Sequence, residues 1–192
     1  MKKLLIFVLV IVLTILIYKS QNTKKNIIVL GDNTVYSLKK YKNFSKNVDY
    51  RIVDLISDIN NNEKITYNNK EYTYQNLLIK SDKLVFSIGI NDLIYIKNVN
   101  INKYEYIDNL LVDLEDLFKL IRKYNKEQIY FVNYYNILED KYIIYLNKRI
   151  EDIVKDYNIN IIDISKINIE EVYPNDVESE NIVKIVESYL LK

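Results

Sequence analysis

The chain contains no cysteine, no histidine and no tryptophan, and its 192 residues include only two glycines and one proline. The absence of cysteine and histidine excludes disulfides, thiol nucleophiles, Cys/His zinc sites and imidazole acid–base catalysis. The formal net charge is +1, with acidic and basic residues interspersed, which argues against nucleic-acid binding. Alanine is also absent while tyrosine occurs 19 times, a bias typical of an AT-rich genome that weakens tyrosine-rich stretches as evidence for ligand stacking.

The three residues that favour sharp turns are Gly31, Gly89 and Pro174. In a chain with so few of them, we expect each glycine where no side chain fits, at a tight turn or beside a ligand. Both glycines directly follow an apolar run of the kind that forms a buried strand. The sequence therefore predicts one site at two strand ends.

The amino terminus has the pattern of a membrane-targeting segment. Lys2 and Lys3 precede an apolar run from Leu4 to Tyr18 that only Thr14 interrupts, and Lys19 follows it. The run is long for a signal-peptide core, and no small-residue cleavage site follows. We interpret residues 1–19 as an uncleaved transmembrane signal anchor, 20–25 as a polar tether, and 26–192 as an extracytoplasmic domain.

The rest of the chain alternates between strand and helix patterns, and 49% of all residues are hydrophobic, enough for a real core. The periodicity predicts strands at 26–30, 48–53, 83–90, 128–135 and 158–165, and helices at 34–41, 54–59, 76–81, 104–124, 139–157 and 176–191. Residues 64–73 resemble an inserted hairpin that turns at Asn68-Asn69. Such alternation predicts an α/β fold, a flavodoxin-like doubly wound parallel sheet of about five strands in the order 2-1-3-4-5. This order would bring the loops after the first and third strands together at the point where ligands bind.

The residues in these loops resemble those of the SGNH/GDSL hydrolase family. Gly31-Asp32-Asn33 is similar to the G-D-S block after the first strand, and Gly89-Ile90-Asn91-Asp92 to the G-x-N-D block after the third. Residues 170–175, followed by a helix, resemble the D-x-x-H-P-N block. The resemblance covers residues 26–192 and implies the family's fold, with no metal and no cofactor.

The reacting positions depart from that pattern. The nucleophilic serine corresponds to Asn33, the catalytic histidine to Tyr173 and the aspartate to Glu170. A phenol with an ordinary pKa near 10 cannot take and return a proton as imidazole does at neutral pH. Residues 41–47, at the place of the family's second block, contain no glycine.

Other residues of the pattern remain. The resemblance assigns Gly89 and Asn91 to oxyanion or ligand binding, and Gly31, Asp32, Asp92 and Pro174 to the frame of the site. Asp32 and Asp92 could also suggest a metal site, but without further clustered carboxylates we expect them to be structural.

Three functions remain open. The first is a membrane-anchored pseudo-hydrolase that keeps a groove for a cell-envelope glycan or acyl ester. The second is an active esterase with another nucleophile, such as Ser37 with Lys39 or Lys40, or Ser45. The third is a protein-interaction scaffold in the cell envelope.

Overall fold

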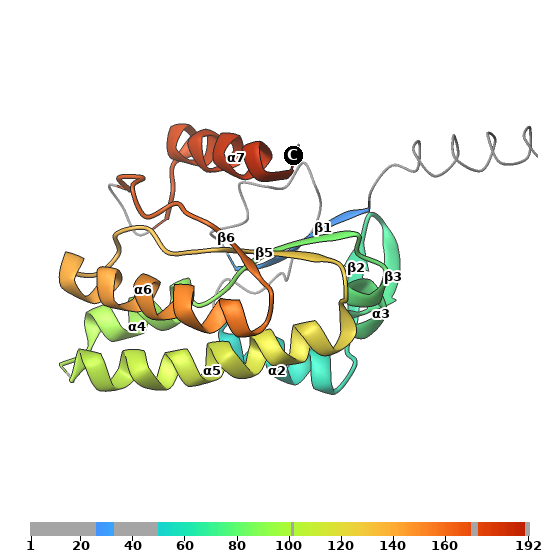
Figure 1. Cartoon of the computed structure of the whole chain (residues 1–192), viewed down its shortest axis with the longest axis horizontal. Helices are drawn as coiled ribbons and strands as arrows, with labels where there is room; N and C mark the ends of the chain where they lie inside the picture. The colour runs from blue at the N-terminus through green and yellow to red at the C-terminus, as the bar shows by residue number, and fades with distance from the viewer. Residues whose placement is uncertain (1–25, 33–49, 101, 170–172, 191–192) are drawn as a thin grey trace, which may run out of the picture.

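A four-stranded parallel sheet forms the centre of the computed structural model, which describes residues 26–32, 50–100, 102–169 and 173–190 (Figure 1). Its strands are β1 (Ile27–Gly31), β4 (Lys83–Ser87), β5 (Gln128–Val132) and β6 (Asn160–Ile162), in the order β1-β4-β5-β6. All pairs are parallel, and Gly31 lies opposite Ser87. The carboxyl ends of the strands therefore meet at one edge of the sheet.

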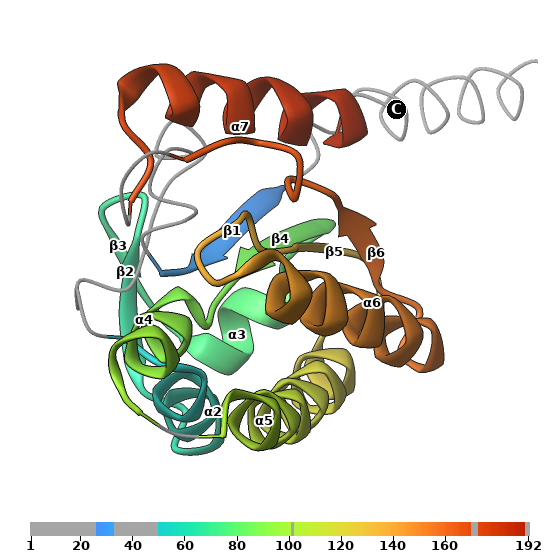
Figure 2. The same ribbon diagram turned by 90° about the vertical axis from the view of Figure 1, so that its left-hand side faces the viewer.

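Helices cover both faces of this sheet. Figure 2 shows α7 (Asp176–Leu190) on one face, and α2 (Ile52–Asn60), α5 (Lys103–Tyr124) and α6 (Asp140–Asp156) on the other. Two shorter helices, α3 (Tyr74–Ile79) and α4 (Ile90–Asn98), precede β4 and follow it. The predicted α/β architecture with a parallel sheet is confirmed.

The core between the sheet and α5 is aromatic. Phe86 of β4, Phe118 of α5 and Phe131 of β5 are fully buried, with ring centroids 5.1 to 5.8 Å apart. Helix α5 buries seven residues at helical spacing: Ile107, Leu110, Leu111, Leu114, Leu117, Phe118 and Ile121. This apolar stripe is the feature from which the sequence predicts the helix.

The inserted hairpin is also confirmed. Strands β2 (Lys64–Tyr67) and β3 (Lys70–Thr73) pair antiparallel, and Asn68 and Asn69 have φ values of 52° and 60°. Two positive φ values in a two-residue loop are typical of the type I′ turn, which asparagine tolerates. The Tyr67 hydroxyl donates a hydrogen bond to the Ile27 carbonyl at 2.8 Å and ties the hairpin to the start of β1.

Several predicted boundaries are wrong. The strand predicted at 48–53 does not continue into the described residues, because helix α2 begins at Ile52 and Arg51 precedes it as the N-cap. The described residues contribute four strands to the sheet, with β1 at one edge of this described part, and the first two residues of the predicted strand lie outside them. The strand predicted at 83–90 ends at Ser87, and Ile90 already begins α4. The strands predicted at 128–135 and 158–165 are shorter than predicted, and they end at Val132 and Ile162.

None of the helices in the described part of the chain is both long and apolar enough to cross a membrane. The predicted anchor (1–19), the tether (20–25) and the predicted helix at 34–41 lie outside the described residues. The anchor stays a prediction from the sequence.

Candidate functional site

The loop after β1 packs directly on the backbone of β4. Gly31 has a φ of 140°, and a Cβ atom at this position would overlap the carbonyl oxygen of Ser87. The next residue, Asp32, donates its backbone N–H to the same carbonyl at 3.0 Å. Only glycine permits this approach, so Gly31 is fixed by packing between two strands.

The second glycine begins α4. Gly89 is the N-cap of the helix in a left-handed conformation, with a φ of 112°, and an added Cβ would collide with the hydroxyl of Tyr134. The buried Asp32 carboxylate accepts a hydrogen bond from the Ile90 backbone N–H at 2.8 Å. The two glycine loops therefore converge, as the sequence predicts, and Asp32 joins them.

Asn91 lies in the first turn of α4 with both ends of its side-chain amide in hydrogen bonds. Its Nδ2 donates to the Tyr50 carbonyl at 2.9 Å, and its Oδ1 accepts from the Tyr173 hydroxyl at 3.1 Å. Asn91 is 8% exposed and Tyr173 37%. The structure thus joins two residues that are 82 positions apart in the sequence. The resemblance assigns the first of them, Asn91, to the oxyanion donor and the second, Tyr173, to the histidine position.

Asp92 faces the other way, towards the start of α2. Its carboxylate accepts a hydrogen bond from the Ile52 backbone N–H at 3.3 Å. Burial raises the pKa of Asp92 to about 6, and the nearby Asp32 carboxylate adds to the rise, whereas the Ile52 N–H and Arg51 oppose it. Asp92 therefore links α4 to α2 while carrying a charge that is costly to bury.

A capping box sets the position of Tyr173. Asn175 precedes α7, and its Oδ1 accepts hydrogen bonds from the backbone N–H groups of Val177 and Glu178 at 3.0 Å each. In return, the Glu178 carboxylate accepts from the Asn175 N–H at 2.7 Å. These reciprocal bonds fix the first turn of α7. Pro174 then connects that turn to Tyr173.

Two buried tyrosines that the sequence analysis missed lie near Asp32. Tyr134 is fully buried, and its hydroxyl donates a hydrogen bond at 2.5 Å to the carbonyl of Ile88, the residue before Gly89. Burial raises the pKa of both Tyr134 and Tyr135, and the neighbouring Asp32 carboxylate raises both further. Both residues lie in the loop after β5, at the edge of the sheet where the strands end. Their place directly after a predicted buried strand is the signal that could have identified them.

The remaining predicted site residues lie outside the described residues. These are Asn33 and Glu170, the alternative nucleophiles Ser37 and Ser45, Lys39 and Lys40, and the loop 41–47. Their roles stay predictions. Among the residues that the structure describes, no three acidic side chains are grouped closely enough to hold a metal ion.

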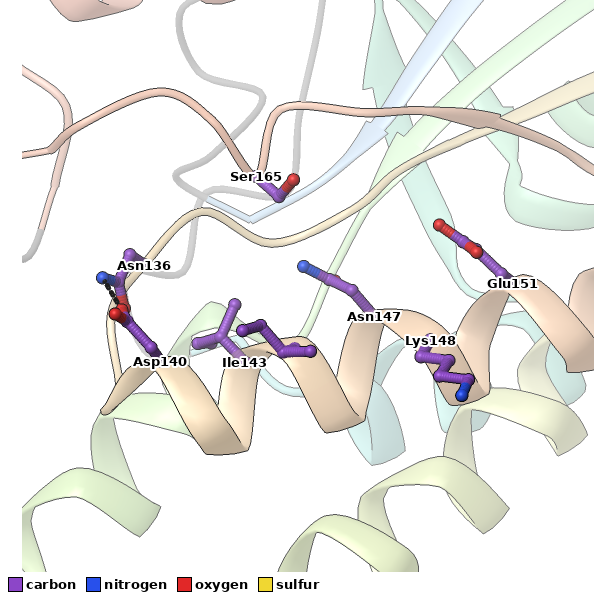
Figure 3. Close-up of a pocket in the computed structure, with 8 residues that line it drawn as sticks. Asn136, Asp140, Ile143, Asn147, Lys148, Glu151 and Ser165 are labelled. Carbon is purple, nitrogen blue, oxygen red and sulfur yellow. Dashed lines mark hydrogen bonds between the residues drawn. The ribbon is translucent and has the colours of Figure 1, made fainter.

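A surface pocket of about 370 Å³ lies beside the site (Figure 3). Side chains of α6 between Asp140 and Glu151 line one wall, and Ser165 lies across from them. Asn136 lies at one end of the pocket, where its side-chain amide donates a hydrogen bond to Asp140. Asn147 in this wall also bonds the Tyr134 backbone in both directions, at 2.8 and 3.2 Å. A second pocket, of about 420 Å³, lies between α2 and α5. Neither pocket is lined by Asn91 or Tyr173.

The arrangement of the described site residues is that of a rigid frame. The hydrogen bonds that Asp32 and Asp92 accept and that Asn91 donates hold three loops together. The Tyr173 hydroxyl donates a further hydrogen bond to Asn91 and is therefore part of this frame.

Comparison with solved structures identifies proteins of the same architecture. The acetyl xylan esterase AlAXEase superposes with a TM-score of 0.61 at 13% identity, covering 85% of this chain and 98% of that one. The lipase Lip_vut3 from a goat rumen metagenome also gives 0.61, at 15% identity over 84% and 95%. A member of the lipolytic G-D-S-L family from Veillonella parvula DSM 2008 gives 0.55, at 15% identity over 84% and 96%.

No family sequence model and no curated protein sequence matches the chain. The likeness to these proteins is therefore structural and concerns the fold. The chain has the α/β fold of the SGNH/GDSL esterases and lipases.

Proposed function

We propose that this protein is a membrane-anchored pseudo-hydrolase that binds a cell-envelope glycan or acyl ester without cleaving it. The observation that carries the proposal is the hydrogen bond from the Tyr173 hydroxyl to Asn91 Oδ1. In an active SGNH/GDSL hydrolase, the residues at these two places would act on the ester. Here they bond to each other, and the nucleophile position is Asn33, whose amide cannot attack a carbonyl.

The loss of several catalytic features of the site together supports this proposal. The side-chain amide of Asn91 donates a hydrogen bond to the Tyr50 carbonyl. The N–H group in that bond cannot at the same time donate to an oxyanion. One retained donor is worth about 10²–10³ in rate, and only when a nucleophile is present to use it. An acetyl xylan esterase among the similar structures supports a glycan ester as the class of ligand.

The topology supports a site that faces away from the membrane. Ile27 begins β1 at the end of the sheet opposite Asp32, so the chain enters the domain at the far end from the site (Figure 1). With residues 1–19 as the anchor and 20–25 as a short tether, the site points outwards into the cell envelope. Anchoring and extracytoplasmic location are parts of this proposal.

An ester-hydrolysis assay of the full chain in a non-ionic detergent, with p-nitrophenyl acetate, tests the loss of catalysis. We expect no turnover above background. The triple variant Asn33→Ser, Glu170→Asp, Tyr173→His restores the family's reacting groups, and turnover by it would show that the geometry of the site is intact. Tyr173→Phe removes only the hydroxyl and is the matched control, which we expect to stay at background.

The alternative of an active esterase has its own test. If the natural chain shows turnover that Ser37→Ala or Ser45→Ala abolishes, one of those serines is the nucleophile and the proposal is wrong. Turnover that survives both substitutions would also refute it, because the site would then contain a nucleophile that neither the sequence nor the described residues identify.

A further inference from the structure

The exposed tyrosines of this protein gather at the end of the molecule that carries the candidate site. In the described part of the chain, the tyrosines with the largest exposed fractions are Tyr95 (41%), Tyr104 (43%), Tyr106 (37%) and Tyr173 (37%). Compositional bias explains why tyrosine is common, but it does not explain this distribution. The start of α5, which carries two of these residues, and the start of α6 lie at the edge where the strands end (Figure 1).

The first group of rings lies between α5 and α6. Tyr104 packs edge-on against Tyr142 and Tyr145, with ring centroids 4.9 and 5.3 Å apart. The Lys141 and Lys103 ammonium groups lie 4.7 and 5.8 Å from the centre of the Tyr142 ring. A cation near a ring face is attracted to it by about 0.5–1 kcal/mol at an exposed site.

The second group lies on the other side of the first turn of α5 and leads to the candidate site. Tyr106 packs against Tyr95 of α4, with centroids 6.1 Å apart, and the Arg51 guanidinium lies 5.1 Å from the centre of the Tyr95 ring. Arg51 follows Tyr50, whose carbonyl accepts the hydrogen bond from Asn91. We call these five rings, Tyr95, Tyr104, Tyr106, Tyr142 and Tyr145, the tyrosine surface.

The charges on the tyrosine surface are mixed. Asp108 accepts a hydrogen bond from the Tyr145 hydroxyl at 2.7 Å, and Glu139 forms an exposed ion pair with Lys141 at 3.0 Å. Carboxylates among the cations repel a phosphate backbone, so the surface does not suit a nucleic acid. Alternating hydrogen-bond donors and acceptors around flat apolar rings instead suit a ligand with many hydroxyl groups.

Packing between helix ends accounts for the ring-to-ring contacts, but it does not account for the exposure of three rings. A pyranose presents C–H groups on its flat face and hydroxyls around its edge. The C–H groups carry partial positive charge and are attracted to the electron-rich face of an aromatic ring, as cations are. Lysines and carboxylates beside the rings can then bond the hydroxyls.

We propose that the tyrosine surface binds a glycan chain and guides it towards the candidate site at Asn91 and Tyr173. This inference rests on the proposed function for the site itself and narrows its ligand to a carbohydrate. The sugar units next to the bound end would lie on Tyr95 and Tyr106, and more distant units on Tyr104.

Native gel electrophoresis of the full chain in a non-ionic detergent tests this inference, with soluble xylan, hydroxyethyl cellulose or glycol chitin dissolved in the gel. We expect at least one glycan to retard the protein. Tyr104→Ala and Tyr95→Ala should each weaken the apparent affinity by about fivefold or more, the size of effect that a lost ring contact gives. Both side chains are exposed, and thermal melting by circular dichroism confirms that the variants are folded.

The matched control lies at the other end of α5. There the Lys123 ammonium lies 5.1 Å from the centre of the half-buried Tyr124 ring, so a similar pair exists far from the site. Tyr124→Ala should leave the retardation unchanged. The inference is overturned if none of the three glycans retards the chain, if Tyr124→Ala weakens binding as much as Tyr104→Ala does, or if oligo(dT) retards the chain and the glycans do not.

Glycan binding by the tyrosine surface and the loss of catalysis at the site can be tested separately. Ester turnover with glycan binding that depends on Tyr104 would overturn the pseudo-hydrolase proposal and leave the tyrosine surface standing. An inert chain that no glycan retards would overturn only the present inference.

Discussion

Asp92 should make the stability of this protein depend on pH in a direction opposite to most surface carboxylates. Burial raises its pKa from 3.8 to about 6, so between these values the folded state binds a proton that the unfolded state does not. The contribution of Asp92 to stability therefore falls as the pH rises from about 4 to about 6, and it stays constant above that. The difference between the two pKa values corresponds to about 3 kcal/mol, at about 1.36 kcal/mol per unit.

The substitution Asp92→Asn tests this reasoning because it removes the charge and keeps an oxygen that can accept from the Ile52 N–H. Because the pKa of about 6 already includes the opposing effect of that hydrogen bond, the whole difference is an upper limit for the gain in stability. We expect the variant to be about 1–2 kcal/mol more stable than the natural chain at pH 7, and to lose this advantage below pH 4. Urea unfolding of the full chain in detergent, followed by tyrosine fluorescence at several pH values, measures the difference. A variant that is equally destabilised at every pH would refute the reasoning.

Three further predictions concern the frame of the fold. Gly31→Ala should cost more than about 3 kcal/mol or prevent folding, because its Cβ would overlap the Ser87 carbonyl, and urea unfolding or expression yield measures this loss. Lys83→Met should cost about 1–3 kcal/mol, because the buried Lys83 ammonium bonds the Leu190 carbonyl at 2.6 Å, and faster amide hydrogen exchange confined to α7 would locate the effect. Asn69→Ala should cost about 1 kcal/mol because of its φ of 60°, and Asn69→Gly should cost nothing, so equal thermal unfolding of the two variants would contradict the assigned turn.

The sequence predicts most of this fold because its patterns are local. Helix α5 follows from a 3.6-residue apolar stripe, and the buried strands β1, β4 and β5 from short continuous apolar runs. The convergence of Gly31 and Gly89 follows from topology, since parallel strands end at the same edge.

The start of α4 could not be predicted in the same way. Residues 84–90 are almost continuously apolar, so the pattern does not distinguish the strand from the helix that follows. The boundary lies at Gly89, the left-handed N-cap of α4, where the Tyr134 hydroxyl from the loop after β5 leaves no room for a Cβ atom. A contact between residues 45 positions apart leaves no local signal in the sequence.

The same limit applies to the site. The motifs identify Asn91 and Tyr173 as residues of interest, but they do not indicate that the two side chains bond to each other or that Asn91 also holds Tyr50. These partners are 82 and 41 positions away in the sequence, and the bonds exist only because three loops meet at one edge of the sheet.

The partners of the motif residues also change what the motif means. Gly31 packs on the Ser87 carbonyl, Asp32 holds the Ile90 N–H and Asp92 the Ile52 N–H. Each of these residues has a structural partner that does not depend on a reaction, so substituting it would damage the fold even in a protein without activity. The motif is therefore evidence for the fold. Evidence for the chemistry has to come from two other positions, those of the nucleophile and the base. In this chain the resemblance assigns those positions to Asn33 and Tyr173.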